Sequence, residues 1–143
     1  MKIEKIIQGK VTLTISARES AQILVERLNS HHVGALVVTE DGKNIEGIVS
    51  ERDVIRAMPG KFDYLSDLHV RDLMTVVVHT CTPDSTVGDV MSTMTRHRIR
   101  HMPVVDSDGT LISIISIGDV VKYHVDEMAD ENSALRDYLS ASH

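Results

Sequence analysis

The sequence predicts an α/β fold built from two copies of one strand–helix–strand–strand–helix unit. The first observation is an internal repeat, because the two halves of the 143-residue chain align at an offset of 66 residues. Ser50 and Asp53 then coincide with Ser116 and Asp119, and apolar positions follow the same offset. The second observation is that strand-like and helix-like segments alternate between polar turns. A repeat of this length is a supersecondary unit, so the two units are expected to dock and bury their apolar faces.

The first copy has a signal for each expected element. Residues 11–15 alternate as a half-buried strand does, and Ser16 with Glu19 has the spacing of a capping box. The acidic turn 40–43 predicts a hairpin. The expected elements are strand 11–15, a helix after Ser16, strands 35–39 and 45–49, and a helix from Ser50 to Pro59–Gly60.

The second copy repeats this order. Thr82 precedes Pro83, which suits a capping hydroxyl followed by proline at the first helical position. The expected elements are a helix opened by Thr82–Pro83, strand 103–105, strand 111–115, and a helix from Ser116 to about Tyr138. The polar outer half of that last helix suggests a protruding or interface segment.

The segment between the copies sets the expected domain organisation. Residues 59–75 join the copies, and residues 70–74 are expected to form a short lead-in helix. The predicted division is residues 1–60 as the first domain, 61–75 as a linker, 76–128 as the second domain and 129–143 as a helical tail.

Composition excludes several classes of function. The formal net charge is −6 and aromatic residues make up only 3% of the chain, so a nucleic-acid-binding protein is not expected. Residues 96–101 form one basic cluster, which suits either a pocket for a small anion or a solvated helix end. No apolar run is long enough for a membrane span and no signal peptide is evident, so a cytoplasmic protein is expected. Cys81 is expected to be a small buried residue rather than a nucleophile.

The repeated Ser-x-x-Asp corner is the strongest candidate for a binding site. The unpaired N–H groups at a helix N-terminus favour an anion, and a carboxylate one turn into the helix can accept hydrogen bonds from two ribose hydroxyls. Ser50 with Asp53, and Ser116 with Asp119, have this arrangement. The alternative is that each pair is only a capping box, in which the two side chains satisfy backbone groups.

Two stretches resemble the signature of the domain first noted in cystathionine β-synthase, the CBS domain: VGALVVTEDGKNIEGIVSERDVI and RIRHMPVVDSDGTLISIISIGDVV. The resemblance covers about residues 9–128. It implies an α/β tandem pair of β-α-β-β-α domains related by a pseudo-twofold axis, known as a Bateman module. It also implies a homodimer that binds an adenine nucleotide between the copies and regulates an unidentified protein. The implied ligands are AMP, ADP, ATP, NAD(H) or S-adenosylmethionine.

Carried over residue by residue, the resemblance implies two unequal sites. In one, Asp119 would hold the ribose and the phosphate would meet Ser116, Arg100 and His101, with Ser16, Ala21, Val33, Gly34 and Ala35 completing the site. In the other, Asp53 and Ser50 would be framed by Thr82, Val87 and Ile99, with Arg52 as the candidate cation. Gly34 and Ala35 stand at the positions that match Arg100 and His101. The Asp119 site is therefore expected to bind phosphate more tightly.

Other functions are less well supported by the residues. No catalytic triad or phosphate-binding glycine loop is evident, so neither an enzyme nor a catalytic cofactor is expected. His97 and His101 are four residues apart, but the chain is expected to leave the helix between them, so no metal site is predicted. A ligand-free dimerisation scaffold is the rival function. No coiled-coil repeat or continuous apolar stripe is evident, so dimerisation rests on the resemblance alone.

Overall fold

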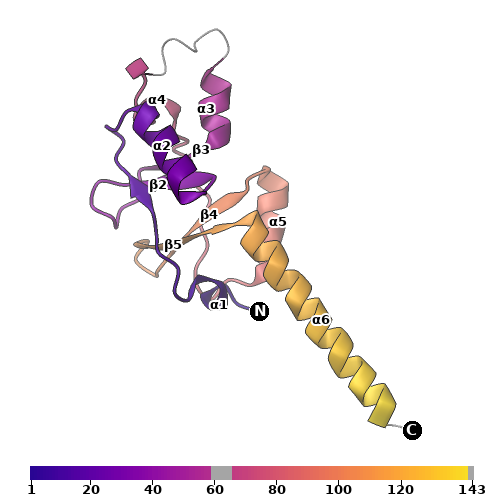
Figure 1. Cartoon of the computed structure of the whole chain (residues 1–143). Helices are drawn as coiled ribbons and strands as arrows, with labels where there is room; N and C mark the ends of the chain where they lie inside the picture. Colours follow the sequence, from indigo (N-terminus) through magenta and orange to yellow (C-terminus); the bar gives the residue numbers. More distant parts are fainter. Residues whose placement is uncertain (59–65, 142–143) are drawn as a thin grey trace.

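A computed structural model of the chain describes residues 1–58 and 66–141, and it confirms the predicted α/β fold of two similar units (Figure 1). The first unit consists of β1 (Thr14–Ile15), α2 (Ala21–His31), β2 (Ala35–Val38), β3 (Gly47–Ser50) and α3 (Glu51–Ala57). The second consists of α5 (Val87–His97), β4 (His101–Val105), β5 (Leu111–Ser116) and α6 (Ile117–Ala141). Two short helices, α1 (Glu4–Ile7) and α4 (Val70–Leu73), precede them.

The two sheets keep the same pairing at the same offset. In the first unit β2 lies between β1, which is parallel to it, and β3, which is antiparallel. In the second unit β4 and β5 pair antiparallel, and the parallel neighbour is reduced to a single bridge between Cys81 and Val104. That bridge corresponds to the pairing of Ile15 with Val38 at the offset of 66 residues.

Both long inner helices begin later than the sequence predicted. The side chain of Ser20 caps α2 by accepting from the Ile23 N–H at 3.1 Å, and Thr86 caps α5 in the same way. The expected caps were therefore wrong. The Ser16 hydroxyl instead donates to the Glu40 carboxylate at 2.6 Å, and Thr82 belongs to a turn preceding the helix. These hydroxyls close turns because their neighbours do not continue into a helix.

The other predicted boundaries differ by small amounts. Only Thr14–Ile15 of the segment 11–15 is paired, and β3 begins at Gly47. The expected helix end at Pro59–Gly60 lies outside the described residues. The lead-in helix is confirmed as α4, and the long last helix is confirmed as α6, which extends to Ala141. The predicted division into domains stays a prediction.

Each unit has its own apolar core, and the lead-in helices exchange between them. The first core includes Leu24 and Leu36 together with Val70 and Leu73 of α4. The second includes Met94 and Met102 together with Ile3 and Ile6, from the N-terminal end of the chain. Since α1 and α4 occupy equivalent positions at the offset of 66 residues, each unit receives the short helix that precedes the other.

Backbone hydrogen bonds hold each exchanged segment in place. The Val87 N–H donates to Met1 O and the Ile3 N–H donates to Ser85 O, both at 2.9 Å. The equivalent bonds in the other unit run from the Ala21 N–H to Leu68 O and from the Val70 N–H to Glu19 O. The N-terminal segment is therefore a structural part of the second unit.

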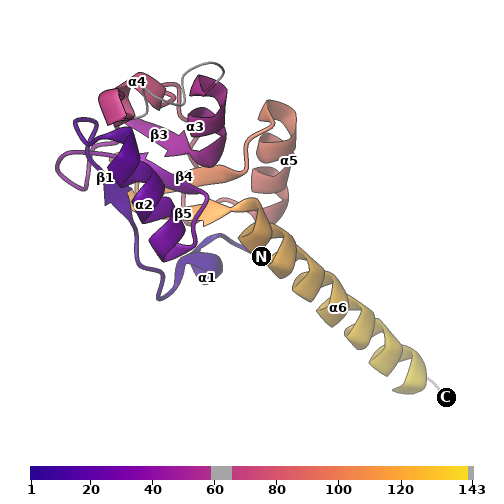
Figure 2. The same ribbon diagram turned by 45° about the horizontal axis from the view of Figure 1, so that its top comes forward.

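The long helix α6 leaves the body of the molecule. Val120 near its start is fully buried in the second core, whereas residues 128–141 are all exposed. Figures 1 and 2 show this helix projecting well beyond both sheets. Within the described residues, none of the helices combines the length and the hydropathy that a transmembrane span requires.

A close contact at Gly47 gives the first prediction. A Cβ atom at this position would lie 2.8 Å from the carbonyl oxygen of Thr75, which bonds to Ile48 in the neighbouring bridge. We expect Gly47→Ala to lower the free energy of unfolding by about 1–3 kcal/mol, because backbone must move to relieve the overlap. Urea unfolding measures this change.

The matched control is Gly88→Ala on α5, since a Cβ atom at this position would have nothing within 4 Å. There we expect a gain of roughly 0.5–1 kcal/mol from helix propensity. Equal effects of the two substitutions would contradict the packing at Gly47.

Candidate functional site

A cavity opens where the first unit meets the second. Its floor is formed by the start of α3, with Ser50 and Asp53, and by the loop before β2, with Gly34 and Ala35. The segment that follows α4 supplies Thr75 and residues 77–79. The second unit contributes residues 98–101, which connect α5 to β4. The cavity therefore brings together segments that lie far apart in the sequence.

The Ser50–Asp53 corner is a capping box that also presents one carboxylate oxygen to the cavity. Asp53 Oδ2 accepts from the Ser50 N–H at 2.8 Å and from the Ser50 hydroxyl at 3.0 Å. Asp53 Oδ1 accepts only a long bond of 3.4 Å from the Thr75 hydroxyl. A bond at the long end of the range is weak and readily replaced. Capping and ligand binding are therefore compatible, because they use different oxygens of Asp53.

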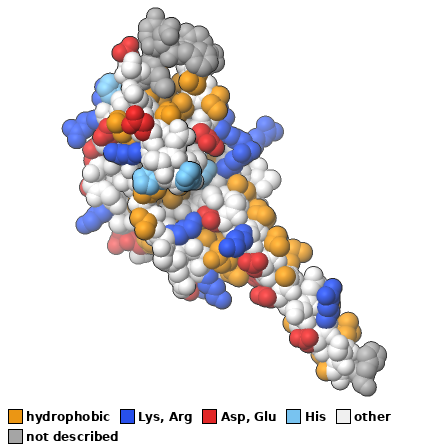
Figure 3. Space-filling model, viewed as in Figure 1, with side chains coloured by type: hydrophobic (Ala, Val, Ile, Leu, Met, Phe, Trp, Pro, Cys, Tyr) orange, Lys and Arg blue, Asp and Glu red, His pale blue; other side chains and the backbone are white. Residues whose placement is uncertain are grey.

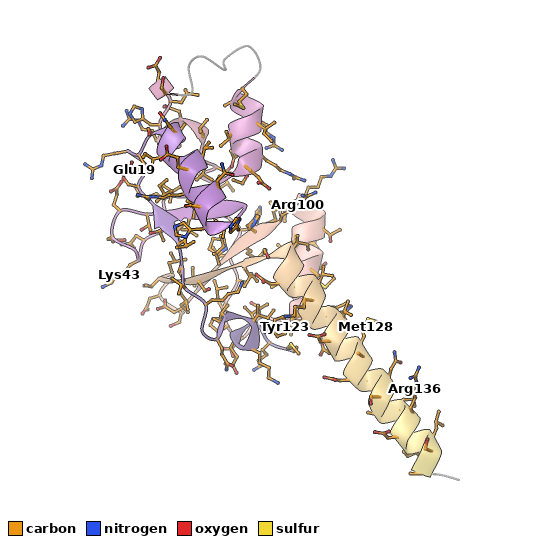
Figure 4. The ribbon with its side chains drawn as sticks, viewed as in Figure 1. Glu19, Lys43, Arg100, Tyr123, Met128 and Arg136 are labelled. Carbon is orange, nitrogen blue, oxygen red and sulfur yellow. The ribbon has the colours of Figure 1, made fainter. Side chains whose placement is uncertain are left out.

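Basic side chains surround this carboxylate. Arg52 and Arg56 extend from α3, and Arg98 and Arg100 extend from the connection between α5 and β4. Figure 4 shows Arg100 where the end of α5 approaches α3, and Figure 3 shows Lys and Arg side chains gathered on that side of the molecule. The Arg52 guanidinium also donates to Arg98 O at 3.3 Å, which links the two units across the cavity.

The placement of Arg100 and His101 differs from the expectation. Both line the cavity that contains Asp53, together with the predicted residues Ser50, Arg52, Ile99, Gly34 and Ala35. The expected lack of a phosphate-binding cation beside Asp53 was therefore wrong. The cause is the pseudo-twofold arrangement: the loop before β4 packs against the loop before β2, and a Cβ on Gly34 would lie 3.0 Å from the His101 ring.

The imidazole of His101 is held in its neutral form. Burial lowers the pKa of His101 below its usual range, and the nearby Arg100 and Lys10 cations lower it further. The carboxylates of Glu51 and Asp119 oppose this shift without cancelling it. A neutral imidazole can donate one hydrogen bond to an anion without repelling the arginines beside it.

A second imidazole borders the same cavity. His79 lines it and stacks on His97, the last residue of α5, with ring centroids 3.9 Å apart. His101 begins β4, so His97 and His101 do not share a helix face, as expected. The described residues contain no group of three or more metal-ligating side chains.

The equivalent corner at Asp119 is filled by a side chain of the protein. Asp119 Oδ2 accepts from the Ser116 N–H and hydroxyl, each at 3.0 Å, as in the other corner. It also accepts from the ammonium group of Lys10, which follows α1. Burial raises the pKa of Asp119, but the Lys10 ammonium and the Ser116 donors outweigh this and lower it overall. The Asp119 carboxylate is thus ionised and already paired.

Several residues predicted for the sites lie away from the Asp53 cavity. Ala21 and Val87 are the first residues of α2 and α5 and are buried in the two cores. Ser16 and Thr82 belong to the turns before these helices. Val33 packs against the first core. The structure does not bring any of these five residues into the cavity lining.

Sequence reasoning missed the segment of residues 75–79, which was expected to belong partly to a linker. Thr75, Val77, Val78 and His79 all line the cavity. Their signal is the repeat itself, because they are the counterparts of residues 9–13, which carry Lys10 past the other corner. Arg56 was also missed, although its spacing of four residues from Arg52 places both on one helix face.

A comparison with family models gives the same division into two copies. The model described as the CBS domain matches residues 7–60 and 70–126, which is most of the chain. The chain belongs to the CBS domain family. The predicted resemblance and the tandem arrangement are thereby confirmed.

Relatives of this CBS pair occur in different organisms. A mitochondrial CBS domain-containing protein of Arabidopsis thaliana is 37% identical over 123 residues, which are 83% of this chain and 59% of that protein. The chain thus spans about three fifths of the length of that relative. A crystal structure of a CBS-domain protein from Agrobacterium tumefaciens superposes with a TM-score of 0.81 at 34% identity, covering 87% of this chain and 99% of that one.

A third comparison concerns a CBS domain pair crystallised with 5′-methylthioadenosine and S-adenosyl-L-methionine. It superposes with a TM-score of 0.78 and covers 89% of this chain and 98% of that chain. Its sequence identity is 20%, so the likeness concerns the fold alone.

The lowered pKa of His101 predicts how stability depends on pH. The folded state holds a proton on this imidazole less readily than the unfolded chain, whose pKa is about 6.5. Stability is therefore full above about pH 6.5 and falls as the pH drops through the lower pKa of the folded state. We expect His101→Gln, which cannot titrate, to flatten this part of the curve of unfolding free energy against pH.

His31→Gln serves as the control, because His31 is exposed at the end of α2. Its curve is expected to follow that of the unsubstituted protein. Curves of the same slope for the protein with His101 and the protein with Gln at this position would contradict the assignment.

Proposed function

We propose that this CBS pair is a regulatory module that binds an anionic adenine nucleotide, AMP, ADP, ATP or NAD(H), in the Asp53 cavity. The observation that carries the proposal is the pairing of a half-free carboxylate with four arginines. Asp53 Oδ1 is placed to accept from ribose hydroxyls, and the guanidinium groups are placed to meet phosphate. A CBS pair of the same fold was crystallised with two adenosine compounds, which supports an adenosine ligand for this architecture.

The charge of the lining favours a phosphorylated ligand over S-adenosylmethionine. Arg52, Arg56, Arg98 and Arg100 outnumber the two carboxylates of Glu51 and Asp53 in the cavity lining. A sulfonium cation would meet uncompensated positive charge there, whereas a di- or triphosphate would neutralise it. Arginine also suits phosphate because its fork of N–H donors fits two oxygens at once.

Regulation rather than catalysis is the activity that we propose. Burial raises the pKa of the Cys81 thiol to about 11, so this cysteine is protonated at neutral pH and is not a nucleophile. The regulated protein is unidentified. In this proposal, ligand binding between the two units changes how they pack, and a partner protein senses that change.

Matched substitutions in the two corners test the proposal. Asp53→Ala and Asp119→Ala each remove the carboxylate of one capping box, so both are expected to cost about 1 kcal/mol of folding stability. Only Asp53→Ala is expected to weaken nucleotide binding by tenfold or more, on the order of one lost charged hydrogen bond. Thermal shift measures this, because ligand at a hundredfold excess over its Kd stabilises by about 2.7 kcal/mol.

Each alternative gives a different pattern. Loss of binding with Asp119→Ala alone would overturn the assignment to the Asp53 cavity and restore the sequence-based preference for the Asp119 site. No thermal shift with any nucleotide in the unsubstituted protein would favour the rival function, a ligand-free dimerisation scaffold. A stronger shift with S-adenosylmethionine than with ATP would contradict the charge argument.

Lys10 is expected to limit binding to one nucleotide per chain. Its ammonium group occupies the Asp119 carboxylate, at the position equivalent to the proposed ribose contact. We expect Lys10→Met to free this carboxylate and to raise the stoichiometry of ATP binding, measured by titration calorimetry, from one to two. Lys5→Met, on the exposed side of α1, is the control and should leave the stoichiometry at one. A value of one for both variants would contradict the blocking role of Lys10.

A further inference from the structure

The outer part of α6 is a helix that its own domain does not support. Residues 128–141 are exposed at every position, and the contacts of α6 with α1 and α5 are made by its first turns. Figure 1 shows this part extending into solvent. An isolated helix of this length is marginal in water, because its stability normally comes from packing of an apolar face.

An apolar stripe runs along α6 with the spacing of a coiled coil, so the expected lack of such a repeat was wrong. Large apolar side chains recur at alternating steps of four and three residues, and one asparagine lies in the same row: Val121, Val125, Met128, Asn132, Leu135 and Leu139. Val125, Met128 and Leu135 are 56%, 52% and 56% exposed, although their side chains are strongly hydrophobic. Figures 3 and 4 show apolar side chains along this helix, including Met128.

The identity of each residue in the row favours a pair of helices. In the usual heptad notation Val125, Asn132 and Leu139 occupy a positions, and Val121, Met128 and Leu135 occupy d positions. A β-branched residue at a favours two strands, and one buried asparagine at a fixes the register and the number of helices. The asparagine costs stability, so its place in the stripe suits a specific partner with the same residue opposite.

The flanking charges select the partner and its direction. Glu131 lies at a g position, and Arg136 lies at the e position of the next heptad. In a parallel pair these two positions face each other across the interface, which gives a Glu131–Arg136 ion pair on each side. In an antiparallel pair g faces g and e faces e, so that Glu131 would meet Glu131 and Lys122 would meet Arg136. Only the parallel arrangement of two identical helices is complementary.

From this stripe and its charges we propose that α6 forms a parallel, in-register two-stranded coiled coil with α6 of a second copy of this chain. The interface is independent of the nucleotide site, because no residue of the stripe lines the Asp53 cavity. It joins two modules at one end and leaves the surfaces of their sheets and inner helices uncovered by this contact.

Sedimentation equilibrium of the full chain tests the interface. We expect Leu135→Glu to weaken dimerisation by at least about tenfold, since it places a charge in the apolar seam of both copies. Ala134→Glu adds the same charge one residue away, at an exposed position outside the seam, and should dimerise as the unsubstituted chain does. A monomeric unsubstituted chain, or equal dimerisation of the two variants, would overturn the proposal.

A charge exchange tests the direction and register. Glu131→Arg and Arg136→Glu should each weaken the dimer roughly threefold or more, and the double variant should restore it. Leu135→Cys should form a disulfide between copies under mild oxidation, whereas Ala134→Cys should not. Failure of the double variant to restore dimerisation, or cross-linking through position 134 in preference to 135, would overturn the parallel pairing. Thermal unfolding of each variant checks that the domains remain folded.

Discussion

The exchange of α1 and α4 between the two units is the constraint on which the rest of the structure depends. Ile3 and Val70 are fully buried, each in the core of the unit that does not follow it directly in the chain. Burying such a side chain is worth about 1.5–3 kcal/mol, so neither unit has a complete core without the exchanged segment. The exchange holds the units against each other, and the cavity exists only because they are held so.

The same exchange makes the two repeated corners unequal. The chain passes each corner just after its lead-in helix, at residues 75–79 beside Asp53 and at residues 9–13 beside Asp119. One passing segment is mostly uncharged and leaves the carboxylate partly free, while the other carries Lys10 into the equivalent place. Two copies of one motif thus acquire different chemistry from residues outside the motif.

Most of the fold could be predicted from the sequence, because the repeat doubles every signal. The corners at Ser50 and Ser116, both hairpins and the extent of α6 were expected from residue patterns that recur at one offset. The helix starts were missed because Ser16 has capping-box spacing, whereas Ser20 and Thr86 are the hydroxyls that the fold places at the caps. Two hydroxyl residues close together cannot be ranked without knowing which turn precedes the helix.

The candidate site was predicted less well, for a different physical reason. Its residues were recognised by type, but their assignment to one Asp corner or the other depends on how the units pack. The position of Arg100 beside Asp53 follows from the contact of the loop at Gly34 with His101, which no local pattern encodes. The stripe on α6 was hidden similarly, because Asn132 interrupts it and its polar neighbours resemble a solvated helix.

The N-terminal segment also links the second corner to the direction of α6. The N-terminal ammonium of Met1 pairs with Glu127 at 2.8 Å, and Lys10 pairs with Asp119, so both contacts hold the first turns of this helix. A helix is stiff over this length, and the direction of its outer half is therefore set where its base is held. Any ligand that displaced Lys10 from Asp119 would release one of the two ion pairs at that base. A change at the Asp119 corner would in this way alter the angle at which the coiled-coil stripe is presented.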